Sequence, residues 1–234
     1  MRRAIHIFKR EVRVYFVSPI AYIVISVFLL VMGWFFFTTF FLFSQANLRN
    51  FFSLLPITFS FVVPAITMRL FSEELNVGSY EILLTMPVTF LEVVLGKFLA
   101  AVVFLMAMLI PTLAYPITVA SLGQLDWGPV FGGYMGAVLL GAAFAAVGLF
   151  ASSLTRNQII AFIIGMAICF SLTLIDKMLF FFPQSLLGLL QYIGADYHFQ
   201  NISKGIIDSR DILYFLSVSF VALYGANLAI QGRN

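Results

Sequence analysis

Cysteine and charged residues are both scarce in this chain of 234 residues. Cys169 is the only cysteine, so the chain cannot form an internal disulfide framework or a thiolate metal site. Charged residues make up 10% of the sequence, well below the globular average of about 25%. Hydrophobic residues make up 62%, and the mean hydropathy is +1.05. This composition excludes an ordinary soluble domain and predicts an all-α polytopic membrane protein.

Patterns for metal binding and nucleic-acid binding are also missing. His6 and His198 are the two histidines, and neither has a second ligand at metal spacing, so we expect no metal site. The net charge of +3 is small, and the basic residues concentrate near the N-terminus. This distribution suits an anionic membrane surface better than nucleic acid. We therefore expect membrane lipids, and no nucleic acid, among the partners.

Charged residues limit where the chain can cross a bilayer, because a span needs about 20 apolar residues with few or no charges. Seven uncharged stretches come near this length: 14–48, 50–68, 98–125, 127–155, 157–175, 178–195 and 212–232. The 178–195 stretch is short and contains Pro183, Gly188 and Gln191, which favours a re-entrant or interfacial helix. The sequence therefore predicts six spans.

The lysines and arginines indicate which side each loop faces. With six spans and both termini in the cytoplasm, nine basic residues lie inside and four outside, as the positive-inside rule requires. A seven-span arrangement gives ten and three, so the charges alone leave both arrangements open. We adopt six spans because six segments are long and apolar. We place an interfacial helix at residues 1–17, a cytoplasmic loop at 72–90, an external re-entrant segment at 182–208, and spans at 18–43, 51–71, 91–120, 128–153, 157–180 and 210–231.

Residues 1–17 have the pattern of an amphipathic helix. At 100° per residue the apolar residues fall on one arc and the basic residues on the opposite one. This pattern predicts a helix along the cytoplasmic leaflet, although a basic flank that only orients insertion has the same charges. Ser18 and Pro19 supply the N-cap and the first position of span one. The apolar arc holds Ile5, Phe8, Val12, Tyr15 and Phe16, and the interfacial basic residues are Arg2, Arg3, Lys9, Arg10 and Arg13.

Four glutamates lie between Arg69 and Lys97. Burying four charged side chains at the centre of a bilayer costs on the order of 10 kcal/mol, so this stretch belongs in water. We interpret it as the docking surface for a soluble protein. The candidate docking residues are Glu73, Glu74, Gly78, Ser79, Tyr80, Glu81, Leu83, Leu84 and Pro87.

Capping residues divide this stretch into short helices. Ser72 is expected to cap the first helix, and Gly78 to end it in the left-handed conformation. Ser79 then caps a second helix over residues 80–84, which Pro87 ends. Thr89 and Glu92 form a capping box that opens span three. The second helix presents apolar residues and one acid, the mixture expected of a small protein interface.

This loop resembles the coupling-helix region of ABC-2 type transporter permeases. The likeness rests on Glu73-Glu74, Gly78-Ser79-Tyr80-Glu81-Ile82-Leu83-Leu84-Thr85-Met86-Pro87, Glu92 and Gly96-Lys97. Further motifs are similar to the gliding-motility-associated branch of the family. They are Ser18-Pro19-Ile20-Ala21-Tyr22, Tyr197-His198-Phe199 and Lys204-Gly205-Ile206-Ile207-Asp208. Together these motifs extend over nearly the whole chain.

The resemblance implies a non-catalytic export permease in a bacterial inner membrane, with its loop docked on a cytoplasmic ATPase. A P-loop needs a glycine five residues before its Gly-Lys pair and Ser or Thr after it, but Leu91 and Phe98 stand there. ATP and magnesium are therefore expected on a separate subunit, and this chain is expected to bind no cofactor. Such ATPases work as pairs, which implies two ATPases and a second permease chain, either identical or paralogous. An extra external subunit is a further expected partner.

Two other classes of function compete with this one. An intramembrane enzyme or a proton-coupled transporter needs ionisable groups at membrane depth, and the six spans carry such groups only near their ends. Ion coupling through hydroxyl and carbonyl groups stays open.

The sequence also predicts a close-packing face of small residues on span four, made within one permease or at a dimer seam. Kinks are expected at Pro64, Pro111 and Pro116.

Overall fold

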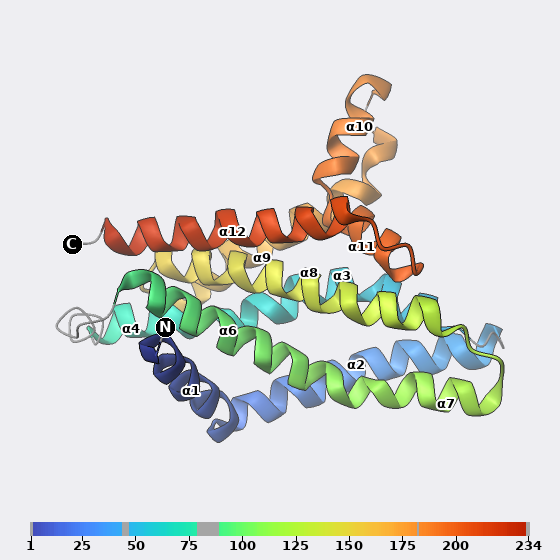
Figure 1. Ribbon diagram of the computed structural model, residues 1–234, viewed down its shortest axis with the longest axis horizontal. Coiled ribbons are helices and arrows are strands. Elements are labelled where there is room, and N and C mark those ends of the chain that lie inside the picture. The colour runs from blue at the N-terminus through green and yellow to red at the C-terminus, as the bar shows by residue number, and fades with distance from the viewer. Residues whose placement is uncertain (1, 44–46, 79–88, 182, 233–234) are drawn as a thin grey trace.

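The computed structural model describes residues 2–43, 47–78, 89–181 and 183–232, and this part of the chain contains helices and no strand (Figure 1). Helix α1 (Arg2–Val17) lies at an angle to α2 (Pro19–Phe43). The other helices are α3 (Arg49–Thr67), α4 (Arg69–Val77), α6 (Phe90–Leu109), α7 (Ala114–Leu122), α8 (Trp127–Leu154), α9 (Gln158–Lys177), α10 (Gln184–Ile193), α11 (Ala195–Ser203) and α12 (Ser209–Gln231), with 3₁₀ turns η1 (Ile110–Leu113) and η2 (Leu179–Phe181).

Six helical segments in the described residues are long and apolar enough to cross a membrane. They are Pro19–Leu42, Arg49–Val77, Phe90–Leu122, Trp127–Leu154, Gln158–Lys177 and Ser209–Gln231. The stretch 178–195 is not among them, because it forms η2 and α10 instead. The expectation of an all-α polytopic membrane protein with six long apolar helices is thus confirmed.

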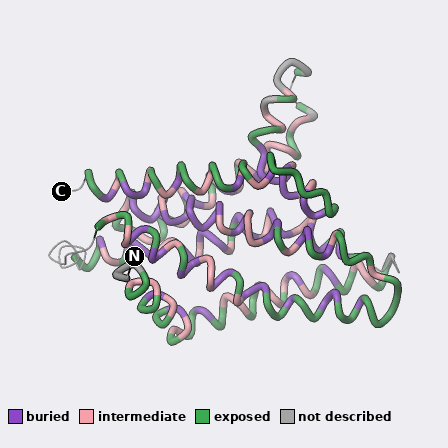
Figure 2. Tube along the Cα trace, in the orientation of Figure 1, coloured by how far each residue is buried: buried purple, intermediate pink, exposed green. Residues whose placement is uncertain are grey.

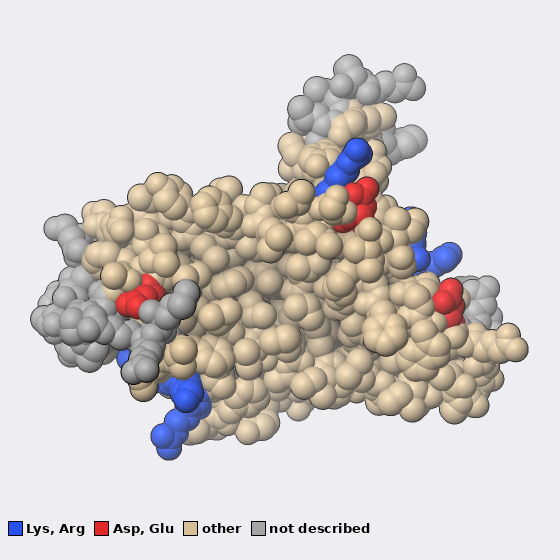
Figure 3. Space-filling view, viewed as in Figure 1, with Lys and Arg blue, Asp and Glu red and all other residues tan. Residues whose placement is uncertain are grey.

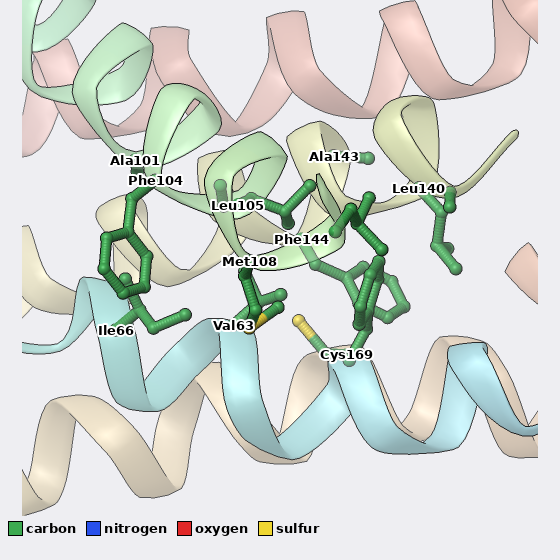
Figure 4. Close-up of a cluster of buried hydrophobic side chains, with 14 of the residues drawn as sticks. Val63, Ile66, Ala101, Phe104, Leu105, Met108, Leu140, Ala143, Phe144 and Cys169 are labelled. Carbon is green, nitrogen blue, oxygen red and sulfur yellow. The ribbon is translucent and has the colours of Figure 1, made fainter. Parts of the chain in front are cut away.

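Helix α8 is the centre of the bundle. In its most apolar window 72% of the residues are buried, against 28% in the first long segment and 17% in the last. Figure 2 shows buried positions gathered where the helices face one another, with exposed positions on the outer helices. The core cluster in Figure 4 joins Val63 and Ile66 of α3, Phe104, Leu105 and Met108 of α6, Leu140 and Phe144 of α8, and Cys169 of α9. Large apolar side chains remain exposed on α2, α9 and α12, as expected for surfaces that face lipid.

Glycines let neighbouring helices approach α8 closely. A Cβ atom added at Gly133 would lie 2.3 Å from the Phe52 ring, and one at Gly141 would lie 2.3 Å from a Leu105 methyl group. At Gly148 it would lie 2.0 Å from Thr67 Oγ1. The small-residue face therefore packs within this chain, against α3 and α6, which decides between the two alternatives that the sequence left open for these glycines.

The segment before the last span forms two short helices. Figure 1 shows α10 projecting away from the bundle, across the direction of the long helices, while α11 returns to lie beside α8. A Cβ atom at Gly132 of α8 would meet the backbone oxygen of Ile202 at 2.2 Å, so α11 packs directly on α8. The external re-entrant role expected for residues 182–208 stays a prediction.

One local expectation is wrong. Ser72 does not cap a helix: α4 begins at Arg69, and the Ser72 hydroxyl donates inside it to the carbonyl of Met68. The nine residues of α4 thus follow α3 directly, although Arg69 is charged. Of the three prolines expected to kink their helices, Pro111 interrupts one through η1, while α3 continues through Pro64 and α7 continues through Pro116.

Gly133→Ala should destabilise the bundle by about 1–3 kcal/mol, because the new methyl group must displace the Phe52 ring from a packed core. Equilibrium unfolding in mixed micelles measures the change. Gly188→Ala is the matched control, since nothing lies within 4 Å of a Cβ atom there. Equal stabilities of the two variants would contradict the close-packing role of α8.

Candidate functional site

Helices α4 and α6 flank the segment that joins spans two and three. Gly78 ends α4 with φ 75°, the left-handed conformation predicted for it. The predicted capping box is present at the start of α6, where Thr89 Oγ1 accepts from the Glu92 amide at 3.3 Å and Glu92 Oε2 accepts from the Thr89 amide at 3.3 Å. Both ends of the loop are thus fixed by local sequence. Of the candidate docking residues, Ser79, Tyr80, Glu81, Leu83, Leu84 and Pro87 lie outside the described residues.

Helix α1 packs against α6 through its apolar arc. Phe8, Val12 and Phe16 are half-buried against the core, while Tyr15 is fully buried with its ring stacked on Phe104 at 5.0 Å. The predicted arc is therefore present, except that Ile5 is exposed. Among the basic residues Lys9, Arg10 and Arg13 are exposed, and Arg2 and Arg3 lie in α1 with side chains outside the described set. Ser18 caps α2 as predicted, its hydroxyl accepting from the Ile20 amide at 3.3 Å.

Four charged residues from three helices form a closed set of ion pairs, here called the charge cluster: Arg10 and Glu11 of α1, Glu74 of α4 and Lys97 of α6. Lys97 Nζ lies 2.9 Å from Glu74 Oε1 and 3.3 Å from Glu11 Oε1. Arg10 Nη2 lies 3.0 Å and 2.7 Å from the same two oxygens, in that order. Two cations thus alternate with two carboxylates, and the formal charges cancel.

Lys97 is the buried centre of the charge cluster, with a side chain 1% exposed. Its ammonium group has three N–H donors, and three acceptors surround it: Glu11, Glu74 and the carbonyl oxygen of Leu70 at 2.7 Å. Nζ also lies 5.2 Å from the centroid of the Phe71 ring. A buried cation is stable only with such complete pairing, because desolvation costs several kcal/mol per ion. Helix α6 is therefore tied to α1 and α4 by charge as well as by apolar packing.

The charge cluster shifts the ionisation of its members in α1. Burial alone would raise the pKa of Glu11, but the nearby charges of Lys97 and Arg10 outweigh it and hold the pKa below the ordinary value of 4.5. Burial would lower the pKa of Arg10, yet the two carboxylates raise it above its ordinary value. Both residues are therefore charged at neutral pH.

A cavity of about 340 Å³ opens beside the charge cluster. This volume falls in the range of small-molecule sites, roughly 300–1,000 Å³. Arg69, at the start of α4, lies with its guanidinium carbon 5.1 Å from the centroid of the Tyr15 ring. The lining residues are Arg10, Glu11, Val14, Tyr15, Arg69, Leu70, Glu73, Glu74, Val77 and Lys97.

The sequence pattern gave no role to Glu11, and it used Lys97 only as a basic residue near the start of span three and as part of the Gly96-Lys97 motif. The structure places Lys97 near the start of α6, as the expectation of ionisable groups near the span ends requires, but with its side chain fully buried, which the pattern did not predict. Two signals pointed to the pair. Glu11 is the one acid in the basic N-terminal stretch, and Lys97 follows seven residues of a helix that is otherwise almost entirely apolar.

A second polar cluster lies at the opposite end of the bundle. His198 of α11 is buried, with Nδ1 2.6 Å from Asp211 Oδ1 of α12 and Nε2 2.9 Å from the carbonyl oxygen of Tyr192. Both ring nitrogens of His198 thus have a polar partner. Lys177 lies 2.9 Å from Asp196. These contacts join α9, α11 and α12, and no group of three or more metal-ligating side chains occurs among the residues described.

Comparison with known proteins gives one family match. A family model described as ABC-2 family transporter protein matches residues 20–231. The match begins just after α1 and extends over all six long apolar segments. A search of curated proteins finds no match to the sequence.

Lys97→Met should destabilise the folded chain by about 3–5 kcal/mol, because it leaves the buried Glu11 and the part-buried Glu74 with only the half-exposed Arg10 as counter-ion. Adding Glu74→Gln should recover part of the loss, as equilibrium unfolding in mixed micelles can measure. Lys9→Met is the control, since Lys9 is exposed on α1 and should change stability by less than about 0.5 kcal/mol. Equal effects at positions 9 and 97 would refute a stabilising charge cluster.

Acid should weaken the charge cluster. The pKa of Glu11 is lower in the folded chain than its ordinary value of 4.5, so its contribution is complete above pH 4.5 and is lost as the pH falls through the lowered value. As the pH falls through this range, the melting temperature of the wild type should decrease more steeply than that of Glu11→Gln. Asp126→Asn, which keeps the N-cap of α8, should retain the wild-type steepness. Parallel curves for wild type and Glu11→Gln would contradict the assignment.

Proposed function

Because the chain belongs to the ABC-2 family of transporter proteins, we propose that it is an export permease whose 72–90 segment docks on a separate cytoplasmic ATPase. The family match supports the coarser part, a membrane-spanning ABC transporter permease that works with an ATP-binding subunit. Export, alternating access and the docking role of residues 72–90 are the proposal. ATP and magnesium are held by the partner, since this sequence lacks a P-loop around Gly96-Lys97.

The charge cluster is the observation that carries the docking proposal. Residues 79–88 lie outside the described residues, and the helices that flank them in the chain are α4 and α6. Glu74 lies three residues before the end of one flanking helix, and Lys97 lies near the start of the other. Glu74 Oε1 and Lys97 Nζ are 2.9 Å apart. A displacement of the loop therefore moves α4 and α6 together, and α1 with them. Such a coupled unit suits a segment that receives force from outside the membrane.

Contacts between α4 and α8 can carry a motion of the charge cluster to the rest of the bundle. Ser152 of α8 donates to the carbonyl oxygen of Met68 at 2.6 Å and accepts from the amides of Phe71 and Ser72 at 3.0 Å each. This hydroxyl joins the break between α3 and α4 to the central helix. Motion of α4 therefore reaches α8, which contacts α3, α6, α9, α11 and α12. We propose this route for alternating access between inward-open and outward-open states.

The assembly proposed is two permease chains with two ATPases. The simplest closed assembly pairs this six-span chain with a second one about a twofold axis, and the second chain is identical or paralogous. We place it in a bacterial inner membrane with both termini in the cytoplasm, and in the gliding-motility-associated branch of the family. An additional external subunit is part of the same proposal.

The distribution of charge supports an ATP-driven permease over a proton-coupled transporter. Figure 3 shows charged side chains at the two ends of the bundle and an uncharged middle on the face in view. Among the described residues, the buried Asp, Glu, Lys and His side chains belong to the charge cluster at one end or to the second polar cluster, around His198, at the other. A proton relay needs such groups at intermediate depth.

Leu84→Asp and Glu81→Lys should each abolish copurification with the ATP-binding subunit while leaving the bundle folded. Both changes alter only the proposed docking surface. The measurement is the ATPase-to-permease ratio after co-expression and affinity purification, with size-exclusion chromatography as the test of folding. Ile206→Asp is the matched control, because it adds a charge to an exposed position after α11, at the other end of the bundle. A stoichiometric ATPase on the Leu84→Asp variant would refute the docking assignment.

A further inference from the structure

Two cavities meet where α1 turns into α2. The cavity beside the charge cluster and a second one of about 150 Å³ share Tyr15, Arg69 and Glu73 in their linings. The second cavity is mostly apolar, with walls from α2, α3 and α6. The combined space, here called the elbow crevice, thus has a charged arm and an apolar arm that join at one arginine and one glutamate. The apolar walls include Ile20, Ala21, Val24, Ala65, Ile66 and Phe104.

Most charges in the charged arm are already paired. Arg10, Glu11, Glu74 and Lys97 neutralise one another within the charge cluster. Arg69 and Glu73 form no ion pair with any other residue in the described part of the chain, although they lie one helical turn apart on α4. Arg69 instead lies over the Tyr15 ring, which hydrogen-bonds through its hydroxyl to the carbonyl oxygen of Ile66 at 3.1 Å. The crevice therefore holds one cation and one anion whose hydrogen-bonding groups are available.

The place of the elbow crevice in the fold indicates its depth. It lies at the junction of an amphipathic surface helix with the first membrane span, which is the level of lipid head groups. Its apolar arm follows α2 and α3 toward the bundle interior, and its charged arm lies at the end that carries the Arg10 and Lys97 side chains. A ligand with a polar head and an acyl chain matches both arms at once.

We propose that the elbow crevice binds an aminophospholipid, with the phosphate on Arg69 and the primary ammonium on Glu73. A guanidinium is well suited to hydrogen-bond phosphate oxygens in pairs. A carboxylate accepts hydrogen bonds from a primary ammonium, whereas a quaternary choline has no N–H to donate. A purely anionic head group would place uncompensated negative charge beside Glu73. Glu73 also belongs to the 72–90 segment proposed to dock on the ATPase. Because the lipid measurement uses this chain without an ATPase, it tests lipid binding apart from docking.

The test is native mass spectrometry of the delipidated full-length chain with equal amounts of dioleoyl-phosphatidylethanolamine, dioleoyl-phosphatidylglycerol and dioleoyl-phosphatidylcholine. The wild type should retain phosphatidylethanolamine about tenfold over each of the others, the effect of one charge-assisted hydrogen bond. Glu73→Gln should bring the ratio near one while phospholipid is still retained. Arg69→Gln should lower retention of all three lipids by about tenfold.

Control variants distinguish binding in the crevice from a general effect of charge at this end of the bundle. Arg156→Gln removes an exposed cation at the same end of the bundle, and Glu92→Gln keeps the capping box of α6; neither residue lines the crevice. Both should keep the wild-type preference. Because Glu73 is exposed and the ratio is measured on one folded sample, a loss of stability cannot imitate the expected result.

Three outcomes would overturn the proposal. If phosphatidylglycerol were retained as well as phosphatidylethanolamine, the ammonium group would not contribute to binding. An undiminished preference in Glu73→Gln would place the ammonium elsewhere. Displacement of the lipid by an equal concentration of soluble phosphoethanolamine would show that the apolar arm contributes nothing and that the site takes a free phosphate amine instead of a lipid.

Discussion

The structure depends on one buried cation. Lys97 lies inside an apolar helix, and its ammonium group can stay there only while carboxylates and a carbonyl oxygen surround it. Those acceptors come from α1 and from the region of α4, so the need to neutralise one charge brings three segments together at a single end of the bundle. Apolar packing fixes how closely the long helices approach, but apolar surfaces in lipid gain little from one particular register. The charge cluster supplies that register between α1, α4 and α6, near the end of α4 at Gly78 and the start of α6 at Thr89.

Helix α8 gives the rest of the molecule its shape. Because its glycines have no side chains, α3 and α6 can pack close to α8. The Ser152 hydroxyl of α8 also hydrogen-bonds to backbone groups of Met68 and Phe71, where α3 is followed by α4. The two polar clusters lie at opposite ends of this central helix, one tied to α1, α4 and α6 and the other to α9, α11 and α12. Between these clusters the bundle is held mainly by close apolar packing around the glycines of α8.

Features that depend on neighbouring residues could be predicted from the sequence, whereas contacts between distant residues could not. The six long apolar helices, the left-handed end at Gly78 and the capping box of Thr89 and Glu92 each depend on a few neighbouring residues, and all are present. Glu74 was expected on a docking surface, but the identity of its partners depends on contacts over sequence separations that a local pattern does not contain. Lys97 contacts Glu11 across 86 positions. Ser72 has a cap-forming side chain, yet tertiary packing continued the helix through it.

The charge cluster also has a consequence for the order of biogenesis. Ribosomes make α1 first, but the ammonium group that completes its pairing is 86 residues further along. Until α6 has been made, Glu11 can pair only with Arg10, although Arg10 can already meet Glu74 of α4. Synthesis of α6 is then the event that completes the pairing of Glu11, so α1 gains its final contacts well after its own residues have been made.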